Sequence, residues 1–255
     1  LKKRYGKDKT FAVPILTNYA LAELIPWSKV TALPFELACL PQKWYRWLRL
    51  PVVSYAIPAL VAIGQCHFHH HKPWNILLRM IRGRCIEPSL EKLQQLQPAS
   101  GGFLEAIPLT SFVVMSLASS GRVRHPVTQS GLEFIVESVR EDGSWPIDTD
   151  LATWNTTLSI NALAEGGEDV TNLGCLEWLL DCQHTEVHPY TGAAPGGWAW
   201  TDLTGGVPDV DDTSGALLAL ARWPANHQES ERITEAARAG IVWLLDVQNS
   251  DGGWP

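Results

Sequence analysis

Residues 195–213 read PGGWAWTDLTGGVPDVDDT, a glycine-rich turn that leads into three aspartates within four positions. A run of small and apolar residues, 214–220, follows them directly. This pattern predicts a buried helix whose first turn carries the carboxylates. Carboxylates are costly to bury unless they are paired, hydrogen-bonded or protonated. The stretch therefore indicates either a metal site or a strong acid.

The glycine-rich turn recurs from about residue 90 onward, each time after a helical segment, which indicates a repeat architecture. The four copies are Gly101-Gly102-Phe103, Gly143-Ser144-Trp145, Gly196-Gly197-Trp198 and Gly252-Gly253-Trp254. Gln97, Gln183 and Gln248 precede three of these copies, and Trp178 and Trp243 each stand five residues before one of these glutamines, Gln183 and Gln248. We expect each glutamine amide to bond the backbone where one helix ends and the next begins. The motif is therefore interpreted as structural.

The helical segments alternate in character. Residues 109–118, 154–164 and 213–221 are apolar nearly all round, whereas residues 131–139, 175–182 and 233–247 carry charges on one side. Helices of the first kind are buried, and helices of the second kind face water on one side. Strand patterns are nearly absent. The sequence thus predicts an all-α protein, an α/α toroid in which the inner helices line a cavity.

Composition narrows the class of protein further. The 255 residues are 45% hydrophobic, enough for one large domain or two smaller ones, and the net charge of −7 does not suggest nucleic acid as a partner. Five cysteines without repeated spacing favour free thiols in a reducing compartment. The first residues are basic and no apolar stretch follows them, so no signal peptide is expected.

The helix–Gln–x3–Gly-Gly-Trp repeats, together with the Asp-x-Asp-Asp-Thr motif at 209–213, resemble the squalene–hopene cyclases of the class II triterpene cyclase superfamily. Segments 5–16, 33–56 and 194–200 also look like segments of that family. The resemblance implies an incomplete double α/α-barrel of the terpenoid cyclase/prenyltransferase type. Residues 1–149 would belong to the companion barrel, and residues 150–255 to the catalytic barrel. Family members are longer, so the chain is interpreted as a central fragment.

The resemblance implies acid-initiated cyclisation of squalene to a hopene- or hopanol-type pentacycle, as in hopanoid biosynthesis, with no cofactor and no metal. Asp211 would be the proton donor, and Asp209 and Asp212 would tune it. An alkene is a very weak base, so its acid must be strong yet protonated. Carboxyl groups close together resist a second ionisation, and a helix N-terminus makes a carboxyl a better acid.

Several alternatives stay open. The aspartates could form a helix cap or a loop for a divalent cation. The protein could be a metal-dependent enzyme of the prenyltransferase type, which zinc or magnesium dependence would reveal. It could also be an inactive isoprenoid-binding scaffold, in which Asp211→Asn would leave function intact.

A carbocation intermediate must be steered without being quenched, and aromatic faces do this through cation–π attraction. By resemblance, the residues that line the cavity are Trp154, Trp200, Tyr55, Ile107, Pro108 and Phe112. Ile107 replaces a glutamine that holds the terminating water in some relatives. The alternative for each aromatic residue is ordinary core packing.

Residues 74–84, WNILLRMIRGR, mix large apolar side chains with three arginines. They indicate an amphipathic helix at a membrane interface, or a helix with its apolar face in the core. The resemblance favours a peripheral protein on the cytoplasmic side of the membrane, which takes squalene or a related polyprenoid from the bilayer. It also allows a homodimer. Residues 50–66 are apolar but too short to span a membrane, so they predict a core helix.

Overall fold

The computed structural model describes residues 12–41, 44, 57–189 and 191–254. Over these residues the regular structure is helical, and two isolated β-bridges take the place of any sheet. The all-α prediction is therefore confirmed. The chain forms two compact units, Leu1–Thr149 and Asp150–Pro255.

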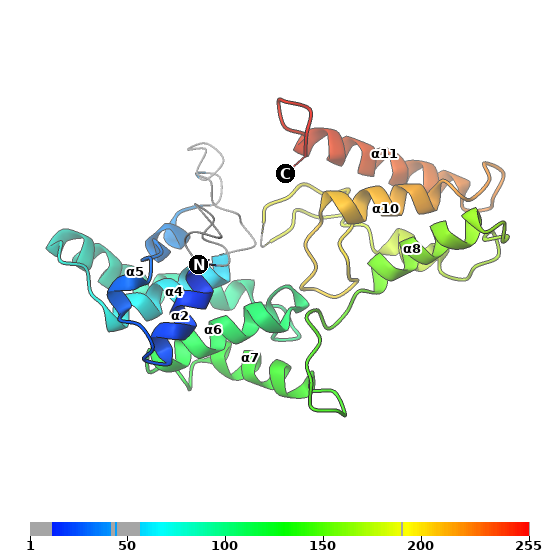
Figure 1. Cartoon of the computed structure of the whole chain (residues 1–255). Coiled ribbons are helices and arrows are strands. Elements are labelled where there is room, and N and C mark those ends of the chain that lie inside the picture. The colour runs from blue at the N-terminus through cyan, green and yellow to red at the C-terminus, as the bar shows by residue number, and fades with distance from the viewer. Residues whose placement is uncertain (1–11, 42–43, 45–56, 190, 255) are drawn as a thin grey trace. The chain divides into compact units, whose positions relative to one another are not determined.

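In the first unit, α4 and α6 are neighbours, α7 packs on α6, and α5 packs on α4 and η2 (Figure 1). The elements of this unit are α2 (Ala12–Leu21), η1 (Trp27–Lys29), η2 (Phe35–Cys39), α4 (Ile57–His70), α5 (Ile76–Leu96), η4 (Phe103–Glu105), α6 (Ile107–Ser119) and α7 (Pro126–Glu137). The apolar run predicted as a core helix is buried in α4, where Val61, Ala62 and Ile63 are inaccessible to solvent. The part of that run before residue 57 lies outside the described residues.

Helix starts in this unit follow the chemistry of their first residues. The side chain of Asn75 accepts a hydrogen bond from the Leu78 amide at 3.1 Å, which caps α5. Pro126 opens α7, where a missing N–H costs nothing. These local signals fix where α5 and α7 begin against the core.

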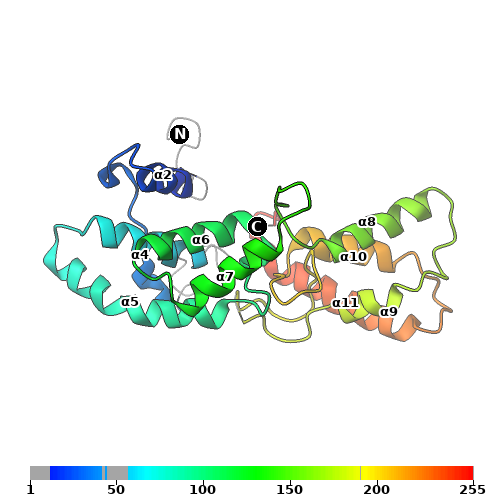
Figure 2. The ribbon, with the colours of Figure 1, turned by 90° about the horizontal axis from the view of Figure 1, so that it is seen from below.

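In the second unit, α10 lies between α8 and α11, and α9 packs on α11 (Figure 2). Its elements are α8 (Ala152–Glu165), α9 (Leu176–Asp181), α10 (Val210–Leu220) and α11 (Ser230–Val247). We expected α8 and α10 to be buried all round, but each keeps an exposed face: Leu158 is 51% exposed and Leu218 is 60% exposed. The reason is that the packing partners of α10 cover only part of its surface.

The repeat turns are held by their glutamines. The Gln97 amide donates to the Gly101 carbonyl at 2.9 Å and to the Val127 carbonyl at 3.1 Å. Gln183 donates in the same way to Gly196 at 2.8 Å and to Ala236 at 2.9 Å. Each of these glutamines thus joins its own turn to the next charged helix, α7 or α11.

Aromatic rings cover the glycines of the turns. A Cβ added to Gly102 would lie 2.3 Å from the Phe134 ring, and one added to Gly197 would lie 2.9 Å from the Trp243 ring. These rings come from the second helix after each turn, α7 or α11. The glycines are therefore required for close approach rather than for flexibility.

The tryptophans of the turns tie back to the helix before them. Each indole N–H donates to a backbone carbonyl at 2.7–2.9 Å. Trp145 donates to Ile135, Trp198 to Leu179 and Trp254 to Leu244. Trp198 is completely buried, whereas the other two are about half exposed. Trp198 is therefore a centre of the second unit's core.

Candidate functional site

The acid motif begins at the start of α10. The Asp209 carboxylate caps this helix, accepting the Asp212 amide at 2.8 Å. The Asp209 amide in turn donates to the Trp198 carbonyl at 3.0 Å, and the Thr213 hydroxyl accepts the Trp198 amide at 2.9 Å. The repeat turn and the acid motif are therefore fastened together by their backbones. The helix-cap alternative expected Asp212 or Thr213 as the cap, whereas the structure has Asp209 in that role. The positive end of α10 therefore lies at the carboxylates.

Asp212 points into the interior of the second unit. Its side chain is 3% exposed, and its Oδ1 has no hydrogen-bond partner among the described residues. Burial raises the pKa of Asp212 to about 8, assisted by a hydrogen bond with the Asp209 carboxyl and by the charges of Asp209 and Asp211. Burial also raises the pKa of Asp209. The two side chains therefore share a site in which Asp212 is mostly protonated at neutral pH.

Asp211 lies on the exposed side of the same helical turn. Successive residues of a helix point about 100° apart, so Asp211 and Asp212 cannot both face the core. The structure thus separates a buried, protonated carboxyl from an accessible one. The role of Asp211 as proton donor stays a prediction.

The two predicted aromatic residues of this unit lie together near the acid motif. The Trp154 amide, in the first turn of α8, donates to the Trp200 carbonyl at 3.1 Å. Both side chains are half-buried, and the Trp200 indole N–H is buried without a partner in the described part of the chain. Trp200 lies two residues after Trp198, which pairs with Asp209 in an isolated antiparallel β-bridge. The segment that carries the Trp200 ring is therefore the one that pairs with the acid motif.

The remaining predicted residues belong to the first unit. Ile107 is buried at the start of α6, and Pro108 beside it is exposed. Phe112 packs against the apolar cluster of Val13, Ala20, Val30 and Ile63, so core packing accounts for part of its surface. Tyr55 lies outside the described residues. Their placement around a substrate stays a prediction.

Sequence reasoning missed the residues that hold the loop before the acid motif. The buried His188 ring bonds the Gly206 carbonyl through Nε2 at 2.9 Å. Its neighbour His184 packs against it edge to face at 5.4 Å, and burial lowers the pKa of His184 to about 4. Asp150 accepts a hydrogen bond from the Thr201 hydroxyl in the same loop. Two histidines spaced four residues apart inside a glycine-rich loop were the available signal.

Comparison with known proteins agrees with this geometry. Residues 150–255 match the model of the squalene–hopene cyclase C-terminal domain. The chain is 31% identical to sporulenol synthase of Bacillus subtilis. That alignment covers 57% of this chain and 23% of the synthase. The chain is 25% identical to a squalene–hopene cyclase of Bradyrhizobium diazoefficiens, covering 94% of this chain and 45% of that protein. It is also 28% identical to a squalene–hopene cyclase of Alicyclobacillus acidocaldarius. That alignment covers 65% of this chain and 28% of that protein.

Residues 150–255 belong to the squalene–hopene cyclase C-terminal domain family, and the partial similarity to these three cyclases supports the same family for the chain. The matched domain coincides with the second compact unit, which holds the acid motif, Trp154 and Trp200. The chain spans less than half the length of these three relatives. The first unit contributes to the longer alignment with the Bradyrhizobium squalene–hopene cyclase, which covers nearly the whole chain.

The buried acid of this squalene–hopene cyclase domain has a measurable effect on stability. The folded protein retains the Asp212 proton up to about pH 8, whereas an ordinary aspartate loses it near 3.8. The free energy of unfolding contributed by this group therefore falls as pH rises from about 4 to about 8. We expect Asp212→Asn to remove that dependence and to be more stable than the parent by about 2 kcal/mol at pH 8.

Urea unfolding at pH 5, 6.5 and 8 measures this difference. The lowered pKa of His184 makes the free energy of unfolding rise with pH below the ordinary pKa of histidine, which is opposite to the effect of Asp212. The diagnostic quantity is therefore the difference in unfolding free energy between variant and parent at each pH. Asp246→Asn, an exposed change on α11, is the matched control and should follow the parent at every pH. A parent protein whose advantage over Asp212→Asn grows with pH would contradict the protonated state of Asp212.

Proposed function

We propose that the protein cyclises squalene, or a related polyprenoid, to a hopene- or hopanol-type pentacyclic triterpene. The observation that carries the proposal is the buried Asp212 carboxyl, hydrogen-bonded to Asp209 at the start of α10 beside the accessible Asp211. Protonation of an alkene requires a protonated carboxyl, and Asp212 holds a proton at neutral pH one residue from Asp211, the proposed donor. The match of residues 150–255 to the squalene–hopene cyclase C-terminal domain supports the same reaction.

In this proposal Asp211 delivers the proton to a terminal alkene carbon. The π electrons form the new C–H bond, and the adjacent carbon becomes a carbocation. Asp212, one residue further into α10, holds a proton next to the donor, and Asp209 accepts a hydrogen bond from it. The final cation loses a proton to give an alkene or takes up water and then loses one, so the overall reaction consumes no proton.

The Trp154 and Trp200 rings are proposed to face the developing positive charge, because the Trp154 amide bonds the Trp200 carbonyl and Trp200 lies two residues after the Trp198 that pairs with Asp209. Tyr55, Ile107, Pro108 and Phe112 are proposed to line the path further from the acid. Ile107 offers no hydrogen bond to a terminating water, which favours loss of a proton over addition of water at that point.

The test is incubation of the full-length protein with squalene, with and without a chelator, followed by analysis of the products by gas chromatography and mass spectrometry. We expect a pentacyclic product in equal yield under both conditions. Loss of product on chelation would favour the metal-dependent alternative. Unchanged squalene in both reactions, with binding retained, would favour a scaffold that only holds isoprenoids.

We also propose that the protein takes its substrate from the cytoplasmic surface of a membrane. Among the described residues, no helix is both long and apolar enough to cross a bilayer. The start of α5 nevertheless exposes five large apolar side chains, Trp74, Ile76, Leu77, Met80 and Ile81. Their exposure supports the interfacial alternative for this segment over the core alternative. Exposed arginines at 79 and 84 flank them, a combination that suits an anionic lipid surface.

A homodimer stays a prediction.

Vesicle co-sedimentation checks the membrane proposal. We expect Trp74→Ala combined with Leu77→Ala to weaken binding to vesicles of phosphatidylcholine and phosphatidylglycerol by at least about tenfold, because each side chain loses its apolar burial in lipid. The matched control is Leu132→Ala combined with Val136→Ala on the exposed side of α7. Equal binding by both double variants would place the lipid contact elsewhere.

A further inference from the structure

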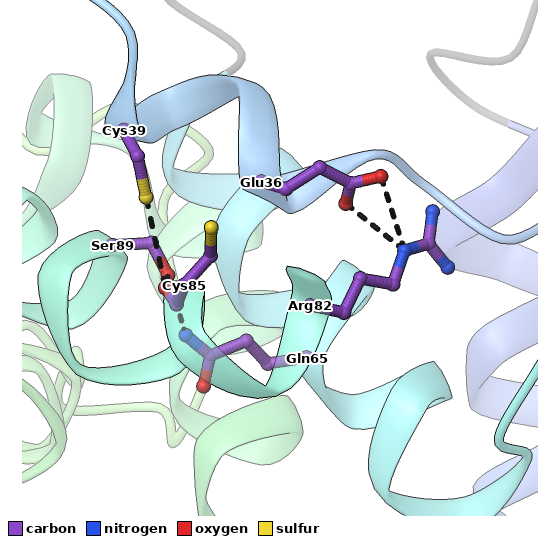
Figure 3. Close-up of polar contacts among 6 residues, drawn as sticks. All are labelled: Glu36, Cys39, Gln65, Arg82, Cys85 and Ser89. Carbon is purple, nitrogen blue, oxygen red and sulfur yellow. Dashed lines mark hydrogen bonds and ion pairs between the residues drawn. The ribbon is translucent and has the colours of Figure 1, made fainter. Parts of the chain in front are cut away.

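Two cysteines from distant parts of the chain meet where η2 lies against α5. Cys39 is the last residue of η2, and Cys85 lies within α5. The Cys39 Sγ is 3.7 Å from the Cys85 carbonyl oxygen, and the two thiols also interact with each other. Figure 3 shows both side chains at this junction, with the Cys39 sulfur directed toward the Cys85 backbone. The fold therefore brings together thiols that are 46 positions apart.

The frame around the pair is held by polar contacts. Glu36, in the same short helix as Cys39, accepts the Arg82 Nε–H with both carboxylate oxygens at 3.1 and 3.0 Å (Figure 3). The Ser89 hydroxyl donates to the Cys85 carbonyl at 2.6 Å. Gln65 of α4 in turn donates to the Ser89 hydroxyl at 2.8 Å. These contacts keep η2 and α5 in register around the two cysteines.

The pair is also reachable from solvent. Cys39 is exposed and Cys85 is partly exposed, and both are free thiols in the structure. Cys66 differs from them, since it is buried in α4 with its sulfur 3.1 Å from the Ser119 hydroxyl. Access for an oxidant and a second thiol within reach favour disulfide formation once one of the thiols has lost its proton.

We propose that Cys39 and Cys85 form a redox-modification site at which hydrogen peroxide converts the two thiols into a disulfide. One sulfur attacks the peroxide, which forms an S–O bond, breaks the O–O bond and releases the first water. The second sulfur attacks this sulfenic acid, which forms the S–S bond, breaks the S–O bond and releases the second water. Two electrons pass from the thiols to the peroxide, and a dithiol reductant returns them.

The consequence is a covalent tie between η2 and the middle of α5. The first turns of α5 carry the exposed apolar side chains from Ile76 to Ile81, so the oxidised form holds that segment more firmly against the first unit. Burial, the Cys85 thiol and the charge of Glu36 raise the pKa of Cys39 to about 12. Because the thiolate is the reacting form, oxidation should be slow at neutral pH and accelerate by up to about tenfold per pH unit.

The experiment treats the folded full-length protein with one equivalent of hydrogen peroxide at pH 7, 8 and 9. Remaining thiols are blocked with iodoacetamide, and a non-reducing digest is analysed by mass spectrometry. We expect a linked peptide pair containing Cys39 and Cys85, lighter than the sum of the two peptides by two hydrogens and lost on reduction. The oxidised protein should also unfold at a temperature higher by about 5 °C or more.

Cys39→Ser and Cys85→Ser should each abolish the linked pair, and Cys182→Ser, in the second unit, should leave its yield unchanged. Serine at position 39 keeps the surface polar, so this variant is expected to fold as the parent does. Complete alkylation of both cysteines after peroxide treatment would overturn the proposal. So would a linked pair that persists in Cys39→Ser, or one that joins other cysteines. None of these outcomes depends on cyclase activity, so the site is tested separately from the proposed reaction.

Discussion

Asp211→Asn in the full-length protein is expected to lower kcat for squalene cyclisation by about 10³-fold or more, with little change in folding stability. The asparagine keeps the size of the side chain but has no acidic proton, so the step that creates the first carbocation loses its acid. Asp211 is exposed at the first turn of α10, so the fold does not depend on its charge. Steady-state product formation, together with a thermal unfolding curve for each variant, measures both quantities.

Comparison of the neighbouring aspartates sharpens the result. Asp212→Asn should also reduce kcat, because it removes the proton held next to the donor, whereas Asp246→Asn on α11 should behave as the parent does. If Asp211→Asn remained active while Asp212→Asn did not, the buried carboxyl would itself be the donor. Full activity in both variants would refute acid initiation by this motif.

Trp198→Ala is expected to destabilise the second unit by about 3–5 kcal/mol, the usual cost of removing a large buried aromatic side chain. Trp198 is completely buried and packs within the cluster formed by Leu179, Ala216 and Ala236, among others. Its indole N–H also bonds the Leu179 carbonyl at 2.8 Å, and that carbonyl would be left without this donor. Chemical unfolding, followed by tryptophan fluorescence and circular dichroism, gives the free energy of unfolding.

The matched control is Trp254→Ala, which removes a tryptophan from the same motif. Trp254 is 46% exposed and bonds the Leu244 carbonyl at 2.9 Å. Its loss should cost about 1 kcal/mol, close to the value of one hydrogen bond and some apolar contact. Equal effects of the two substitutions would mean that the repeat motif, rather than burial, sets the contribution of each tryptophan.

Much of the architecture is predictable from the repeats. The glutamines were expected to join neighbouring helices, and Gln97 and Gln183 do so through two carbonyls each. The sequence did not show which helix supplies the ring over each glycine. Phe134 and Trp243 each cover a turn that lies one helix earlier in the chain, because α7 packs on α6 and α11 packs on α10. Only packing in three dimensions reveals that pairing.

The contact between Cys39 and Cys85 was equally hidden. Their spacing matches no sequence motif, and the odd number of cysteines argued for unpaired thiols. The two residues meet because η2 packs on α5, an arrangement set by buried residues such as Phe35 and by the ion pair of Glu36 with Arg82. Long-range packing of this kind leaves no local pattern in the chain.

The amino-acid sequence by itself determined that three carboxylates would stand at the start of an apolar helix, because capping residues and helical periodicity are local properties. The tertiary structure alone decided which of them is buried. Asp212 turns toward the interior and keeps its proton, while Asp211, one residue earlier, faces outward. Adjacent residues of a helix point in different directions, and the side that becomes the interior depends on how α8 and α11 pack around α10.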